Sequence, residues 1–191
     1  VTSVRRRDGT WIVGDGHEER EYDGIISTIP IPELVRAIPD APKEVRTAAE
    51  SLVHRSLVTV LLGIGRPNLN DFSWVYFPTP EDGKFNRISF PSNFSDRTAP
   101  EGTSSAVAEI TCDVGDELWS SPDDALVEHV VERADHLGIF RRADVVAARV
   151  ARTRYAYVVF DRDHRRNLDL VNAFANQMGI RLLGRFGQFD Y

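Results

Sequence analysis

The sequence predicts an α+β protein: a mainly antiparallel sheet with flanking helices, preceded by a small β-meander. First, short runs rich in Val, Ile, Thr and aromatic residues recur between Pro, Gly, Asn and Asp turn signals. Second, the segments with helical spacing of apolar residues are few and do not alternate regularly with the strands. Third, the strands follow one another in groups, which is typical of antiparallel sheets, whereas each parallel pair needs a crossover connection.

The amino-terminal part is expected to be a meander followed by a corner. Asp8-Gly9 is a strong hairpin signal. The strands of the meander are expected at residues 1–6, 10–13 and 20–22. A short buried strand is then expected at residues 25–28, and Pro30 and Pro32 stop it. Pro32 also suits the first turn of a helix, where a missing N–H costs nothing, so the corner leads from a strand into a helix.

The rest of the sequence predicts helices that pack on a sheet. Ser121-Pro122 is a good helix start and Gly179 is a good helix end. Helices are expected at residues 32–38, 43–52, 121–137 and 165–178. Strands are expected at residues 56–63, 72–77, 85–91, 105–111, 145–157 and 180–183. We expect the sheet face to carry eight side chains, each partly buried: Leu57, Val58, Val60, Trp74, Tyr76, Ile88, Val107 and Val150.

Composition narrows the class of protein. The 191 residues carry 23 basic and 29 acidic side chains, a net charge of −6, and no basic stripe is interleaved with aromatic residues, so nucleic acid is not an expected partner. The single cysteine, Cys112, excludes an internal disulfide framework. No apolar run is long enough to span a bilayer and no signal peptide opens the sequence. We therefore expect a cytoplasmic protein without a membrane span.

Two motifs resemble a phosphate-binding loop and a metal site, but neither has the residues that such a site requires. Gly63-Ile64-Gly65 follows a strand like a phosphate loop, but no third glycine follows and Pro67 blocks a helix. Asp161, Asp163 and His164 are metal-ligand types, but the arginines among them would repel a cation, so no metal site is expected. By residue chemistry alone, the chain shows no self-contained active site.

Two other stretches are candidate binding sites. Arg152, Arg154, Tyr155 and Tyr157 lie on one predicted strand, and forked donors beside tyrosine rings would suit an anionic or planar ligand. The alternative is a half-exposed face of a sheet with no ligand. The second stretch, residues 183–187, ends a strand with Gly184, Arg185 and Gly187. Glycines permit a ligand to approach the backbone closely, and the arginine between them could meet a phosphate or an anionic ring.

Three stretches in order resemble the FAD-dependent amine oxidase and protoporphyrinogen oxidase-like oxidoreductases, and most closely their UDP-galactopyranose-mutase-like branch. The first is residues 22–34, which is similar to the strand that returns to the FAD domain. The second, residues 156–161, is similar to the motif Ala-Tyr-Pro-x-Tyr-Asp of that family, with Val158 and Phe160 departing from it. The third, residues 184–191, is similar to the segment that passes the flavin.

The resemblance implies a domain plan. Residues 1–31 would be a remnant of the FAD domain, residues 32–183 the substrate-binding domain, and residues 184–191 the start of the return to the FAD domain. The Gly-x-Gly-x-x-Gly loop of the family is absent, and the chain begins without Met and stops without a polar tail. We therefore expect the central fragment of a longer flavoenzyme, inactive alone, that self-associates through its exposed edges and binds FAD only in the intact protein.

The resemblance also implies roles for residues and leaves the reaction open. Gly184, Arg185 and Gly187 would contact FAD, and Arg152, Arg154, Tyr155 and Tyr157 would contact a small-molecule substrate. The expected parent activity is oxidation of a substrate by FAD. The first alternative is isomerisation of a nucleotide sugar by a UDP-galactopyranose mutase-like enzyme. The second alternative is a stand-alone α+β binding module without redox activity.

Overall fold

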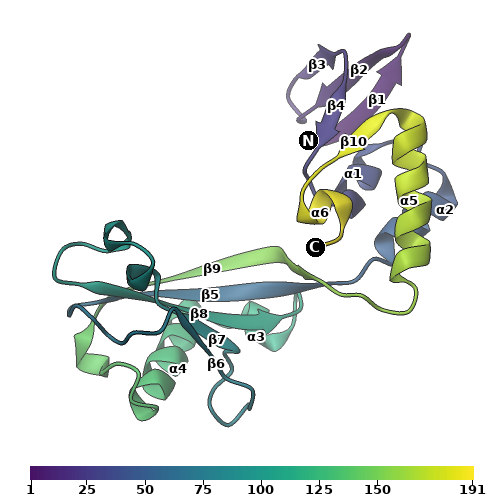
Figure 1. Ribbon diagram of the computed structural model, residues 1–191. Coiled ribbons are helices and arrows are strands. Elements are labelled where there is room, and N and C mark those ends of the chain that lie inside the picture. The colour runs from purple at the N-terminus through teal and green to yellow at the C-terminus, as the bar shows by residue number, and fades with distance from the viewer. The chain divides into compact units, whose positions relative to one another are not determined.

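A computed structural model describes all residues from Val1 to Tyr191 (Figure 1). The chain forms two compact units, which are described separately. Unit 1 consists of Val1–His54 and Tyr157–Tyr191, and unit 2 consists of Arg55–Ala156. Each unit has its own hydrophobic core.

Unit 1 begins with the meander that the sequence predicts. Strands β1 (Ser3–Arg7), β2 (Thr10–Gly14) and β3 (Glu19–Tyr22) pair antiparallel in that order. Asp8 and Gly9 both have positive φ, 51° and 88°, as a two-residue hairpin turn requires. Every residue of β3 is exposed, so the meander keeps an open edge. The expected self-association of such an edge stays a prediction.

The remainder of unit 1 packs helices against a two-stranded parallel sheet. Strand β4 (Ile25–Ser27) pairs with β10 (Ile180–Leu182), and helix α5 (His164–Met178) packs against α2 (Lys43–Glu50). The short helices are α1 (Ile31–Ala37) and α6 (Arg185–Gln188). The expected helix end at Gly179 is confirmed, because Gly179 takes the left-handed conformation with φ 82°. The core contains Trp11, Ile31, Leu34, Leu168, Val171 and Phe189.

Unit 2 is built on a five-stranded sheet in the order β6-β7-β8-β5-β9. Its strands are β5 (His54–Ile64), β6 (Trp74–Tyr76), β7 (Arg87–Ser89), β8 (Ser104–Cys112) and β9 (Val145–Val158). The pairs β6–β7, β7–β8 and β5–β8 are antiparallel. Strand β9 also runs antiparallel to β5, because Ser56 bonds to Arg154 near one end and Gly63 lies beside Ala147 near the other. The α+β fold with a mainly antiparallel sheet is therefore confirmed.

Helices cover one face of this sheet. Helices α3 (Glu117–Ser120) and α4 (Asp123–His136) lie on the same side of it (Figure 1). Alternate residues of β5 and β8, from Val58 to Ile64 and from Ala106 to Cys112, are buried in the core with α4. The residues between them, such as Leu61 and Val107, lie on the opposite face. The 3₁₀ turns of unit 2 are η1 (Pro91–Asn93), η2 (Asp96–Thr98) and η3 (Arg142–Asp144).

The expected single face of eight residues is wrong because side chains alternate along a strand. Val58 and Val60 point into the helix-covered core, while Leu57, between its buried neighbours, lies on the other face. Trp74 and Tyr76 are exposed at the short edge strand β6, not buried. The compact units also divide the chain at residues 54/55 and 156/157, whereas the functional domains 1–31, 32–183 and 184–191 stay a prediction.

Candidate functional site

The face of the unit 2 sheet opposite α3 and α4 has an ion pair at its centre. Arg87 on β7 lies directly opposite Glu109 on β8, and its Nε donates to Glu109 Oε1 over 3.1 Å. The Glu109 side chain is only 10% exposed. A carboxylate with so little exposure costs free energy unless a cation accompanies it, which Arg87 provides. This pair places two fixed charges in the middle of the face.

Aromatic rings extend this face toward the β6 edge. Tyr76 lies beside Arg87, whose guanidinium carbon is 5.8 Å from the ring centroid. Trp74, across from Ser89, stacks on Phe94 with centroids 6.2 Å apart and planes 16° apart. All three rings are more than 45% exposed. Exposed rings beside a fixed cation and anion can bind a planar or partly apolar small molecule.

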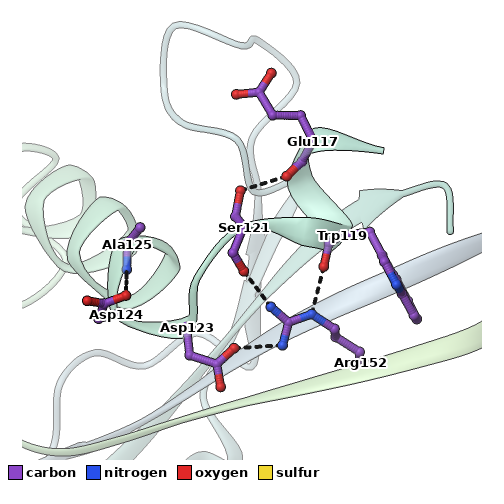
Figure 2. Close-up of polar contacts among 7 residues, drawn as sticks. All are labelled: Glu117, Trp119, Ser121, Asp123, Asp124, Ala125 and Arg152. Atoms are coloured by element: carbon purple, nitrogen blue, oxygen red, sulfur yellow. Dashed lines mark hydrogen bonds and ion pairs between the residues drawn. The ribbon is translucent and has the colours of Figure 1, made fainter. Parts of the chain in front are cut away.

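Arg152 of β9 points away from this face, into the layer of α3 and α4. Its Nε donates to the Trp119 carbonyl oxygen over 2.8 Å and its Nη2 to the Ser121 carbonyl oxygen over 2.6 Å (Figure 2). Its Nη1 bonds to Asp123 Oδ1 over 2.6 Å. All three nitrogens therefore hold the link between the two helices. Arg152 therefore lies off the face that carries Arg87 and Glu109.

The other three residues expected on β9 lie nearer its carboxyl end. Arg154 is exposed, and its guanidinium carbon lies 5.7 Å from the centroid of the Tyr155 ring. Tyr155 and Tyr157 are half-buried. Their expected contact with substrate stays a prediction. The ion pair of Arg87 and Glu109 was missed by the sequence analysis, because only the strand register brings residues 22 positions apart face to face.

A second candidate site lies in unit 1, where the parallel strands β4 and β10 both end. The Leu183 N–H donates to the Ser27 carbonyl oxygen over 2.9 Å, which ties the two carboxyl ends together. The carboxyl ends of parallel strands are where open α/β sheets bind ligands. The buried hydroxyl of Ser27 has no hydrogen-bond partner. Such an orphaned polar atom is uncommon in a folded protein and marks this end of the strands.

The three residues expected to contact a cofactor meet at this end, and they differ in what they do. Gly184 has φ 81° and open space where a Cβ would stand. Arg185 is exposed, with its guanidinium carbon 4.5 Å from the centroid of the Tyr191 ring. Gly187 is buried, and a Cβ on it would lie 2.9 Å from the Ser27 carbonyl oxygen. Gly187 thus permits close contact between two segments of the chain itself, while only Gly184 adjoins open space.

The family model described as flavin containing amine oxidoreductase matches residues 1–173. The chain belongs to that family. Its fold is similar to reduced UDP-galactopyranose mutase, with TM-score 0.79 and 24% identity over 94% of this chain and 38% of the mutase. A protein described as a putative protoporphyrinogen oxidase from Exiguobacterium sp. 255-15 gives TM-score 0.74 and 18% identity over 96% of this chain and 40% of that one. The fold is also similar to a putrescine oxidase, with TM-score 0.57 and 15% identity over 85% of this chain and 38% of the oxidase.

These amine oxidoreductase relatives are longer than the chain, which spans about two fifths of the first two solved structures. No curated protein sequence matches the chain. None of its helices combines the length and the apolar character that crossing a membrane requires. Membership of a flavin-containing family makes a flavin the cofactor to test against the residues present. The open space at Gly184, the exposed Arg185 and the orphaned Ser27 hydroxyl fit one edge of such a group.

Proposed function

We propose that the chain contributes the substrate-binding domain of an FAD-dependent oxidoreductase. The observation that carries this proposal is the one-sided covering of the unit 2 sheet. One face packs on helices, while the other carries the partly buried pair of Arg87 and Glu109 beside the exposed rings of Trp74 and Tyr76. An ion pair flanked by exposed rings is a polar anchor within an apolar surface, which is how proteins fix the orientation of small substrates.

Arg87 and Glu109 would orient the substrate by its polar group. The two side chains hold each other in place through two hydrogen bonds to Glu109 Oε1, so little conformational entropy is lost when a ligand binds. Tyr76 and Trp74 would contact an apolar or planar part of the same molecule. The expected substrate contacts of Tyr155 and Tyr157 on β9 stay a separate prediction. The substrate class is therefore a small molecule that joins a polar group to an apolar or flat one.

Gly184 and Arg185 would contact FAD in the intact protein. FAD, when bound, would accept electrons from the substrate. Arg185 is exposed at the end of the parallel strands, and a cation beside the flavin would stabilise negative charge on the reduced ring. The chain has no Gly-x-Gly-x-x-Gly loop for the pyrophosphate, so FAD affinity would depend on the rest of the protein. We expect the isolated chain to bind FAD weakly.

The alternative reaction is isomerisation of a nucleotide sugar. It is supported by the fold similarity to reduced UDP-galactopyranose mutase, at TM-score 0.79. The two reactions differ in their net electron balance, because an oxidase needs a terminal electron acceptor and an isomerase does not. A stand-alone binding module without redox activity is the remaining alternative. It predicts a colourless full-length protein.

The decisive experiment is to purify the full-length protein and record its visible absorption spectrum. We expect a stoichiometric flavin spectrum, and a colourless protein that no added FAD converts would contradict the proposal. Arg87→Gln and Glu109→Gln should each raise KM at least about tenfold, because each removes one of the two charges that would orient the polar group of the substrate. The matched control is Arg142→Gln, which breaks an exposed ion pair with Glu128 on the helical side of unit 2 and should leave KM unchanged.

A further inference from the structure

Unit 2 contains a cavity of about 430 Å³ that the proposed substrate contacts do not use. Its floor is formed by β5, β8 and the first part of β9, and its roof by the segment that connects β7 to β8. This volume is within the range of small-molecule pockets, roughly 300–1,000 Å³. The residues that line it on the floor include Leu61, Gly63, Val107, Ala147 and Arg149. The residues that line it on the roof include Pro91, Thr98, Ala99 and Pro100.

The cavity exists because the floor is built from small side chains. A Cβ on Gly63 would lie 3.2 Å from the Cβ of Ala147, and a Cβ on Gly65 would lie 2.8 Å from Val146 Cγ1. Glycine inside a strand marks a place where another group approaches the backbone closely. The motif Gly63-Ile64-Gly65 does not match a phosphate loop, but its glycines have a structural role. It lets β9 lie close to β5 and leaves a shallow floor with little side-chain volume.

The roof is held in place by hydrogen bonds, so the cavity is formed before any ligand arrives. The Ser105 N–H donates to Ser92 Oγ over 2.8 Å. Asn93 Nδ2 donates to the carbonyl oxygens of Phe72 and Asn70 over 2.6 Å and 2.8 Å. Thr103 Oγ1 donates to the Pro100 carbonyl oxygen over 2.6 Å. A preorganised cavity loses less entropy on binding than a flexible one.

The lining combines a mainly apolar surface with one charged side chain. Leu61, Val107 and Ala147 supply apolar surface, and Leu61 is 39% exposed. Arg149 is exposed at the margin of the cavity and makes no hydrogen bond or ion pair. The acidic residues of the roof segment, Asp96 and Glu101, form no ion pair with it. An apolar cavity with one unpaired cation at its margin is complementary to an apolar molecule that ends in a carboxylate.

We propose that this cavity binds a small aliphatic carboxylate, with the alkyl chain over Gly63 and Ala147 and the carboxylate on Arg149. The alkyl chain would cover Leu61 and Val107, and burial of apolar surface would supply most of the affinity. The guanidinium would supply the preference for an acid over a neutral head group. The proposal does not require a flavin and does not depend on the substrate face around Arg87.

The test uses the 191-residue chain with decanoate and decanol as probes. Binding of each probe is measured by amide chemical shifts and by calorimetry. Both probes should shift the amides of Leu61, Gly63, Val107 and Ala147. Ala147→Phe should abolish binding of both, because the new ring fills the cavity. Ala151→Phe is the matched control, because residue 151 lies four positions beyond Ala147, on the same face of β9 and outside the cavity. This variant should leave the binding of both probes unchanged.

Arg149→Gln separates the two parts of the proposal. It should weaken decanoate binding about fivefold, as expected for an exposed charge pair, and leave decanol binding unchanged. Unchanged decanoate binding in this variant would overturn the role of Arg149. Binding of both probes that survives Ala147→Phe, or no binding at millimolar probe, would overturn the site itself. The proposed oxidoreductase function would stand in each of these cases, because its test is the flavin spectrum of the full-length protein.

Discussion

Arg152→Ala should destabilise unit 2 by about 2 kcal/mol. The substitution removes hydrogen bonds to the carbonyl oxygens of Trp119 and Ser121, and a bond from a protein donor to a partly buried carbonyl is worth about 1 kcal/mol net. The ion pair with Asp123 adds less than about 0.5 kcal/mol, because the Asp123 side chain is 61% exposed and solvent screens the pair. The cost therefore comes from the two main-chain carbonyls.

The assay is equilibrium urea unfolding, read from the amide signals of β8, which belong to unit 2. With a slope of about 2 kcal/mol per molar urea, the loss should lower the midpoint by about 1 M. Arg152→Lys keeps the charge but cannot reach three acceptors, so it should lose about half as much. Asp123→Asn removes only the screened ion pair and should lower the midpoint by less than about 0.3 M.

The same series separates a structural role of Arg152 from a role in substrate binding. If Arg152 served a substrate, the alanine variant would keep the wild-type midpoint and lose ligand affinity in the full-length protein. An unchanged midpoint in Arg152→Ala would refute the reasoning from its three hydrogen bonds. A lower midpoint with unchanged KM is the expected result.

Two further predictions concern a histidine and a glycine. The Lys84 N–H donates to His129 Nε2 over 3.0 Å, and burial, with the charges of Lys84 and Arg133, lowers the His129 pKa. The stability of unit 2 should therefore fall as pH drops below about 6.5, and His129→Gln should reduce this loss in urea unfolding. Gly187→Ala should destabilise unit 1 by about 1–3 kcal/mol, because the new Cβ would lie 2.9 Å from the Ser27 carbonyl oxygen. Gly24→Ala is the control, since its Cβ would meet open space and should not change stability. Thermal unfolding measures both effects.

The helices and strands could be predicted because their signals are local. The strand expected at residues 145–157 is β9, Val145–Val158, and the helix expected at residues 165–178 is α5, His164–Met178. Turn and cap residues such as Asp8-Gly9 and Gly179 adopt positive φ by their own conformational preference. This preference depends little on the rest of the chain. These features follow from sequence without any knowledge of the tertiary fold.

The candidate sites could be predicted only in part, because they depend on which segment lies next to which. The alternation of β9 is readable from the sequence, but the face that meets α3 and α4 is set by its pairing with β5. Gly187 signalled a close approach, but the group that approaches it is the backbone at Ser27. Arg87 and Glu109 are unremarkable surface charges in the sequence, and the register of β7 on β8 makes them a pair.

Strand β9 shows why residue type alone does not assign a role. Arg149 and Arg152 are three positions apart, so they lie on opposite faces of one strand. Arg152 is fixed by two carbonyl oxygens and a carboxylate in the helical layer, whereas Arg149 has no hydrogen bond or ion pair at the margin of the cavity. Arg152→Ala should therefore change stability and not decanoate affinity, and Arg149→Gln should change affinity and not stability. If both variants changed the same quantity, the division of β9 into a structural face and a binding face would be wrong.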